Sequence, residues 1–273
     1  MTLQHVAVGV DGSLNAVRAL DRAADEAALR GAELRVLYAV PDADEAAPVL
    51  ASAEARVRER HPGLPLLTVP VEGGAVPALA RESARAVLTV VGTRGHGTLT
   101  GLLAGSVSAR LAARARGPLL VVRGDHPCDG AQPVLLGLES DADADAAARA
   151  FEEAELRGAP LRVLHASTHR HLTPELPSPL PATSPGQRHQ AREEQAEEDV
   201  PRFALTRLRE AHPGVAVDAR TVRTAPAHAL PEATRQAGLV VVGAPRRTGA
   251  PSPVVHALLH GSHCPVLLVP AAG

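Results

Sequence analysis

A glycine-rich segment that follows an apolar run could bind a phosphate group. It extends from Val90 to Leu111 and contains five glycines, no aspartate and no glutamate. Its last glycine, Gly105, stands directly before Ser106, where a helix-length segment begins. A helix N-terminus presents unpaired N–H groups and a partial positive charge to an anion. Because glycine lets the backbone come close to a ligand, this spacing predicts a phosphate site formed by the loop and the start of the helix.

Two better-known phosphate-binding motifs do not fit this segment. A P-loop requires lysine before its serine or threonine, and the chain contains no lysine. A dinucleotide-binding fingerprint requires its glycines directly after the first strand of a domain. Here Gly95 and Gly97 follow the fourth apolar run, and Thr100 stands where the last glycine would be needed.

The composition excludes several classes of protein. A length of 273 residues is typical of two domains, and a net charge of -2 gives no overall attraction to nucleic acid. Aromatic residues, on which single-stranded nucleic acids stack, are limited to Tyr38, Phe151 and Phe203, so the core must be aliphatic. Cys128 and Cys264 lie far apart, which argues against a disulfide framework. Because no apolar run approaches the about 20 residues that span a bilayer, we expect a cytoplasmic protein without a membrane or nucleic-acid partner.

The two halves of the chain repeat each other, because short sequences recur in the same order. The recurring pairs are VAVGVDGS at Val6–Ser13 and VLLGLES at Val134–Ser140, GAELRVLYA at Gly31–Ala39 and GAPLRVLHA at Gly158–Ala166, VLTVVG at Val87–Gly92 and GLVVVG at Gly238–Gly243, and GPLLVV at Gly117–Val122 and CPVLLV at Cys264–Val269. A polar, turn-prone linker, Arg123–Pro133, separates them. We therefore predict two domains, 1–124 and 133–273.

Aliphatic runs alternate with helix-length segments within each half. The strands expected in the first half are Val6–Val10, Leu34–Ala39, Leu66–Val71, Val87–Val91 and Leu119–Val122. The expected helices are Leu14–Arg30, about Ala46–Arg60, Pro77–Ser83 and Ser106–Arg116. Nearly continuous apolar strands between helices indicate a parallel sheet that is covered on both faces. The fold class predicted is α/β, with two tandem doubly wound domains.

The glycine spacing resembles the motif of a known family. Gly92, two further residues, Gly95, nine further residues and then Gly105 with Ser106 are similar to the G-x2-G-x9-G-[ST] ATP-binding motif of the universal stress proteins. Both halves resemble the domain of that family, so the resemblance covers the whole chain. It implies a tandem universal stress protein whose five-stranded parallel sheets have the order 3-2-1-4-5. It also implies that the two closing strands pair with each other and make an intramolecular pseudo-dimer.

The resemblance further implies the residues that would bind ATP, with or without magnesium. Asp11 would lie beside the adenosine, Ala39 would offer backbone polar groups to the adenine edge, and the glycine loop would hold ribose and phosphates. The expected nucleotide-binding residues are Gly9, Val10, Asp11, Ala39, Val91, Gly92, Arg94, Gly95, Gly105, Ser106, Val107 and Ser108. The implied function is that of a nucleotide-responsive regulator in stress adaptation, with an unknown protein partner and with a homodimer as an option.

The second half departs from this motif. Its acidic residue is Glu139, and Arg246 stands at the place of Gly95. Ser252 and Pro253 take the places of Gly105 and Ser106. Because proline has no N–H to give to a phosphate, we predict that this half does not bind nucleotide in the same way. Another difference is an inserted segment, Ser167–Gln190, which we interpret as a flexible loop.

Other interpretations stay open at this point. The glycine loop could be a plain surface loop, Asp11 could serve only the turn with Ser13, and Ser106 could be only a helix cap. The sequence shows no convincing catalytic group, since His96 is the only imidazole in the loop. A slow ATPase or other nucleotide hydrolase, and a partner scaffold that binds no ligand, are therefore the alternatives to a nucleotide-binding regulator.

A cluster of possible metal ligands has a simpler explanation. His256, His260 and His263 precede Cys264, and histidines four apart share a helix face. The last two of these residues stand where the chain enters its closing strand, and cysteine is often simply buried at such places. We predict no metal site.

Overall fold

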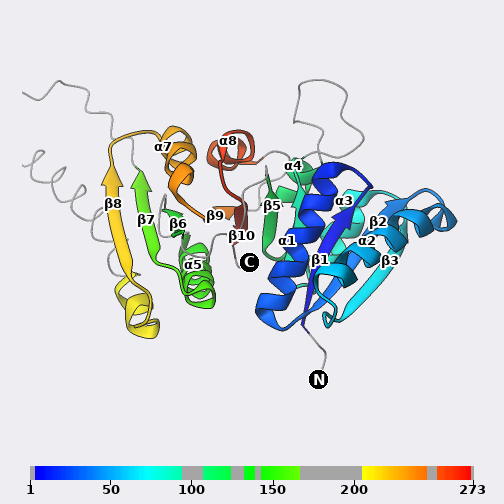
Figure 1. Ribbon diagram of the computed structural model, residues 1–273. Coiled ribbons are helices and arrows are strands. Elements are labelled where there is room, and N and C mark those ends of the chain that lie inside the picture. The colour runs from blue at the N-terminus through cyan, green and yellow to red at the C-terminus, as the bar shows by residue number, and fades with distance from the viewer. Residues whose placement is uncertain are drawn as a thin grey trace, which may run out of the picture.

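We describe the protein from a computed structural model, which places residues 4–93, 107–123, 132–138, 143–166, 205–244 and 251–271. One long sheet runs through the molecule, with helices on both of its faces (Figure 1). No helix within these ranges is long and apolar enough to cross a membrane.

The first half alternates strands and helices along the chain. Its elements are β1 (His5–Val10), α1 (Leu14–Arg30), β2 (Glu33–Val40), the 3-10 helix η1 (Ala43–Ala46), α2 (Ala47–Arg60), β3 (Leu66–Glu72), α3 (Ala75–Glu82), β4 (Leu88–Gly92), α4 (Val107–Ala112) and β5 (Leu119–Val122).

The second half follows the same alternation. Its elements are β6 (Val134–Leu138), α5 (Ala144–Arg157), β7 (Leu161–Ala166), β8 (Val217–Val222), α7 (Pro226–Ala233), the 3-10 helix η4 (Thr234–Gln236), β9 (Leu239–Ala244), α8 (Pro253–Gly261) and β10 (Val266–Pro270). Residues 205–211 are helical as well. The inserted segment Ser167–Gln190, predicted to be a loop, lies outside the described residues.

The ten strands form one sheet in the order β3-β2-β1-β4-β5-β10-β9-β6-β7-β8. Each half therefore has the predicted order 3-2-1-4-5, with parallel pairing inside the half. The halves join through β5 and β10, which pair antiparallel with Val121 opposite Val266 and Leu119 opposite Leu268. This confirms the predicted pairing of the closing strands. The domain boundaries themselves, 1–124 and 133–273, stay predictions.

The core is aliphatic, as the scarcity of aromatics predicts. One cluster of buried residues lies under α1, α2 and α5, and a second lies on the opposite face under α3, α4, α7 and α8. Phe151 on α5 is the one fully buried aromatic ring among the described residues. The strands β4, β5, β6 and β9 at the centre of the sheet are buried almost throughout, which is typical of a parallel sheet covered on both faces.

The predicted bounds of helix α1 are correct, and the capping residues at its two ends explain them. Ser13 caps its first turn, since the hydroxyl oxygen accepts a hydrogen bond from the N–H of Ala16 at 3.2 Å. Gly31 ends it in the left-handed region at φ 60°, and its N–H reaches the carbonyl groups of the last turn. Gly158 ends α5 at the same φ, so the repeat extends to the helix caps.

Two expected helices have different bounds. Helix α4 ends at Ala112 rather than at Arg116. The N–H of Arg114 donates to the carbonyl of Leu111 three residues back, at 2.9 Å, and the N–H of Arg116 donates to the hydroxyl of Ser83 at 2.9 Å. Helix α3 begins at Ala75, so Pro77 lies within its first turn, where its missing N–H costs no helical hydrogen bond. The remaining differences in the first half are of one residue at the ends of strands and helices.

Candidate nucleotide pocket

A pocket opens at the carboxyl ends of β1, β2 and β4. It therefore lies beside the point where the strand order reverses between β1 and β4, which is where open α/β sheets bind ligands. Its lining residues are Gly9, Val10, Asp11, Ala16, Leu37, Ala39, Ala75, Ala78, Leu79, Val91, Gly92, Thr93 and Val107.

Most of the predicted site residues that the structure describes meet in this pocket. They come from the ends of three strands, the β1–α1 turn and the start of α4, and they are Gly9, Val10, Asp11, Ala39, Val91, Gly92 and Val107. Ser108 lies next to the pocket rather than in its lining, and its buried hydroxyl donates to the carbonyl of Thr93 at 3.4 Å. Arg94, Gly95, Gly105 and Ser106 lie outside the described residues.

Helix α3 forms a wall of the pocket that the sequence analysis missed. Ala75, Ala78 and Leu79 are three and four residues apart, so they share one face of the helix. Leu79 packs on Gly9, where an added Cβ would lie 2.8 Å from its Cδ1 atom. The sequence shows the helical spacing of these residues. It does not show which helix covers the strand ends, because that depends on the tertiary fold.

The turn between β1 and α1 is fixed by its own hydrogen bonds. The carboxylate of Asp11 accepts a hydrogen bond from the N–H of Ser13 at 3.0 Å. Gly12 between them has φ 77°, a left-handed conformation that residues other than glycine rarely adopt. Asp11 therefore stabilises the turn with Ser13, which was one of the interpretations left open by the sequence. Its partly exposed side chain also lines the pocket.

Gly92 ends β4 directly beneath the first turn of α1. A Cβ added here would lie 2.7 Å from the backbone carbonyl oxygen of Asn15, which is closer than real Cβ contacts. The close approach brings Ala16 of α1 and the end of β4 into the same pocket. Glycine at this position is thus required by packing, whether or not a phosphate binds.

The corresponding region of the second domain is arranged differently. At Gly243, the counterpart of Gly92, the obstacle to a Cβ is the side-chain carboxylate of Asp143, with an oxygen 2.3 Å away. Ser252 caps α8 by accepting from the N–H of Val255 at 3.2 Å, and Pro253 is the first residue of the helix. The start of α8 therefore lacks the N–H that a phosphate would meet first. Glu139 and Arg246 lie outside the described residues.

The histidines near the C-terminus are explained by helix packing. His256 and His260 lie one turn apart on α8, and Nδ1 of His260 is 2.7 Å from the carbonyl oxygen of His256. Cys264 is buried, and burial raises the pKa of its thiol to about 11. Among the residues that the structure places, no three histidine, cysteine or acidic side chains gather as metal ligands would.

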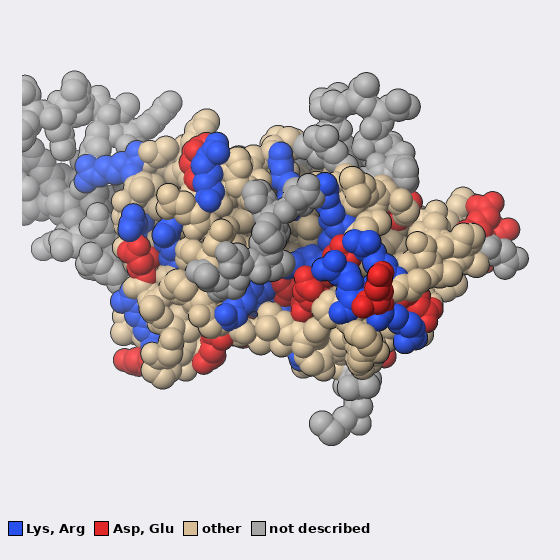
Figure 2. Space-filling model, viewed as in Figure 1, with Lys and Arg blue, Asp and Glu red and all other residues tan. Residues whose placement is uncertain are grey.

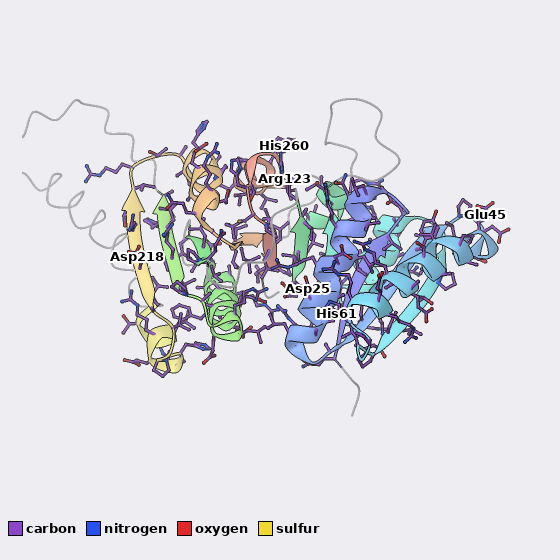
Figure 3. The ribbon with its side chains drawn as sticks, viewed as in Figure 1. Asp25, Glu45, His61, Arg123, Asp218 and His260 are labelled. Atoms are coloured by element: carbon purple, nitrogen blue, oxygen red, sulfur yellow. The ribbon has the colours of Figure 1, made fainter. Side chains whose placement is uncertain are left out.

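The described residues on the face shown in Figure 2 carry charges of both signs. Basic and acidic side chains lie side by side over α1 and α2 on the face shown in Figure 2. Several are paired, as in the bidentate contact of Arg56 with Asp21 at 2.6 and 2.7 Å. Asp25 on α1 and His61 after α2 point toward each other, with 3.0 Å between Oδ1 and Nε2 (Figure 3).

The fold and the pocket define a tandem α/β protein of two doubly wound domains, with a pocket at the strand ends of the first. The profile of the universal stress protein family matches residues 2–61, 42–123 and 130–270. A universal stress protein of Mycolicibacterium smegmatis is 34% identical over 269 residues, which cover 89% of this chain and 88% of that protein. The chain belongs to the universal stress protein family.

A solved structure that matches the whole chain agrees with this fold. A universal stress protein from Archaeoglobus fulgidus superposes over 100% of both chains with a TM-score of 0.70 and 15% identity. A universal stress protein solved in complex with cAMP is 31% identical and covers 46% of this chain and 100% of its own, with a TM-score of 0.39.

Proposed function

We propose that the first domain binds ATP in the strand-end pocket and that the protein acts as a nucleotide-responsive regulator in stress adaptation. The observation that carries this proposal is that residues predicted from the glycine motif and the β1–α1 turn line one pocket.

The chemistry of the lining suits an adenosine group. Its walls are mostly aliphatic, with Leu37, Leu79 and Val91 able to pack on the faces of a purine. The carboxylate of Asp11 can accept a hydrogen bond from a ribose hydroxyl. The backbone of Ala39 offers polar groups to the adenine edge. The phosphates would extend toward the start of α4, where Val107 opens the helix.

Binding, rather than catalysis, is the function that we propose. Among the described residues that line the pocket, Asp11 is the only one with a titratable side chain, and it is engaged in the β1–α1 turn. General acid–base catalysis at a phosphate requires such a group beside the reacting atoms. The magnesium ion, the cytoplasmic location and the protein partner expected from the sequence belong to the same proposal and stay predictions.

A pair of matched substitutions tests the site. Ala78 lines the pocket, and Ala78→Leu would place a branched side chain where the adenosine packs. Ala229 has the corresponding position on α7, one residue before the Leu230 that packs on Gly137. Isothermal titration calorimetry should show ATP binding to the wild type and to Ala229→Leu. Binding to Ala78→Leu should be weaker by about tenfold or more, since overpacking costs about 1–3 kcal/mol and about 1.4 kcal/mol is tenfold in affinity.

Two results would count against the proposal. If the wild-type protein binds no ATP, the pocket does not serve this ligand. If both variants bind ATP as well as the wild type while keeping their fold, the nucleotide binds elsewhere. Far-UV circular dichroism and a melting curve for each variant separate a filled pocket from an unfolded domain.

A further inference from the structure

Helices α1 and α5 carry a buried group of charged side chains with the same spacing in both domains. Each helix contributes an arginine, a glutamate one turn later and another arginine directly before its glycine cap. These residues, which we call the α1–α5 cluster, are Arg22, Glu26, Arg30, Arg149, Glu153 and Arg157.

Each glutamate of the cluster binds arginines from both domains. Within a helix, Glu26 is 2.8 Å from Arg22 and also contacts Arg30. Across the domain boundary, Nη2 of Arg30 donates to Glu153 at 2.5 Å, and Nη2 of Arg157 donates to Glu26 at 2.5 Å. The two crossing bonds are related by the same pseudo-symmetry that relates the domains.

The cluster is shielded from water, so its ion pairs are screened less than pairs on the surface. The side chains of Glu26 and Glu153 are 2% and 1% exposed, and that of Arg30 is 8% exposed. Burial alone would raise the pKa of Glu26, but the surrounding guanidinium groups, that of Arg22 foremost, lower it to about 2. Removal of one member of such a buried set leaves the others uncompensated, so a substitution in one helix should disturb the other as well.

Other contacts also join the domains. Strands β5 and β10 pair at three residue positions, Leu119, Leu120 and Val121 in β5. Arg123, at the end of β5, donates to the carbonyl of Leu259 on α8 at 2.9 Å, and Figure 3 shows it beside that helix. A rotation of the domains about the β5–β10 pair would have to break the crossing bonds of the cluster.

Helix α1 connects the cluster with the pocket. Its first turn lies on Gly92 through the carbonyl of Asn15, and Ala16 lines the pocket. Glu26 lies about 15 Å further along the same rigid helix, at 1.5 Å per residue. Helix α5 makes the equivalent link in the second domain, since Asp143 before its first turn contacts Gly243 at the end of β9.

We propose that the α1–α5 cluster couples the nucleotide pocket of the first domain to the second domain, which thereby regulates nucleotide affinity. The inference rests on the proposed function and names the regulation of that same site. The second domain holds α1 through Glu153, and α1 forms a wall of the pocket. Because coupling is reciprocal, a nucleotide that selects one position of α1 also biases the position of α5.

The test compares two neighbouring glutamates on α5. Glu153→Gln removes the buried carboxylate of the cluster, while Glu152→Gln removes an exposed one that contacts only Arg149 among the described side chains, at 3.3 Å. Calorimetry should show ATP binding weakened about fivefold or more by Glu153→Gln, the lower end of typical couplings, and unchanged by Glu152→Gln. Amide hydrogen exchange in the absence of nucleotide should rise in α1 and α5 of the Glu153→Gln variant only.

A milder variant keeps the test decisive if Glu153→Gln unfolds. Arg30→Gln removes only one crossing bond, and each glutamate keeps two guanidinium partners. The fold should therefore hold, while exchange in α1 rises and ATP affinity falls in the same direction as in Glu153→Gln. If the Glu153→Gln variant keeps the wild-type amide hydrogen exchange and the wild-type affinity for ATP, the proposed coupling is wrong. A wild-type protein that binds no ATP would instead overturn the proposed function and the regulation of affinity, while the exchange measurement would still decide whether the cluster ties the domains together.

Discussion

The strand ends of the two domains differ although the sheets beneath them are alike. In the first domain the end of β4 contacts the backbone of α1, and a pocket opens beside it. In the second domain the end of β9 contacts the side chain of Asp143, and α8 begins with a proline capped by Ser252. The duplicated fold therefore fixes the sheet and its core, while the loops after the fourth strand of each half are free to diverge.

The α1–α5 cluster is the opposite case, because both domains retain it. Its members stand at the same place before Gly31 and Gly158, and each half satisfies the other's charges. A residue needed for joining the domains is constrained in both copies, whereas a residue needed for one ligand is constrained in one. The comparison thus distinguishes residues that join the domains from residues that bind a ligand in one domain.

The largest effect expected from this comparison is a pH dependence of stability. The folded-state pKa of Glu26 is lowered from 4.5 to about 2, so Glu26 stabilises the fold fully above pH 4.5 and loses this contribution as the pH falls toward 2. A shift of this size corresponds to about 3 kcal/mol. Urea unfolding of the wild type should therefore show a steep loss of stability between pH 4.5 and 2.

The Glu26→Gln variant provides the control for this prediction. It cannot gain or lose a proton at position 26, so its free energy of unfolding should be lower at neutral pH and should vary less over the same pH range. Equal acid sensitivity of the variant and the wild type would show that other carboxylates cause the loss, and that the cluster contributes little to stability.

A smaller difference should appear when the same substitution is made at the two strand ends. Gly92→Ala forces a Cβ against a backbone carbonyl that cannot move independently, so we expect a loss of about 2 kcal/mol. Gly243→Ala meets only the carboxylate of Asp143, which can rotate away, so the loss should be under about 1 kcal/mol. Gly214→Ala, where nothing lies within 4 Å of the added Cβ, provides the baseline in urea unfolding. Equal losses at Gly92 and Gly243 would contradict the distinction.

Much of the fold was predictable because its signals are local. The bounds of α1 follow from Ser13 and Gly31, and the repeat with the family resemblance predicts the strand order and the β5–β10 pairing. The end of α4 was not predictable, because Arg116, expected inside the helix, donates its N–H to Ser83 on a distant segment instead. Local sequence predicts where helices can form, but partners far along the chain decide where some of them end.

The candidate site was predictable only where a motif or a resemblance marks it. Gly92 and Asp11 lie in the pocket as expected. Leu79 was missed because an aliphatic residue on a helix carries no sign of which cavity it borders. The α1–α5 cluster was missed for a related reason: Glu26 and Glu153 look like surface residues of two amphipathic helices until the pairing of the domains brings them together.

The smallest expected effect comes from the start of α8. Pro253→Ala would return an N–H to the first residue of the helix, at a cost of about 0.4–1 kcal/mol in stability because proline restricts the unfolded chain. One N–H does not rebuild a phosphate site, since Ser252 still caps the helix and Asp143 still covers the end of β9. Calorimetry should therefore give the same ATP stoichiometry for the variant and the wild type. A second ATP bound by the variant would mean that the missing N–H alone separates the two domains, and the wider rearrangement at β9 would then be incidental.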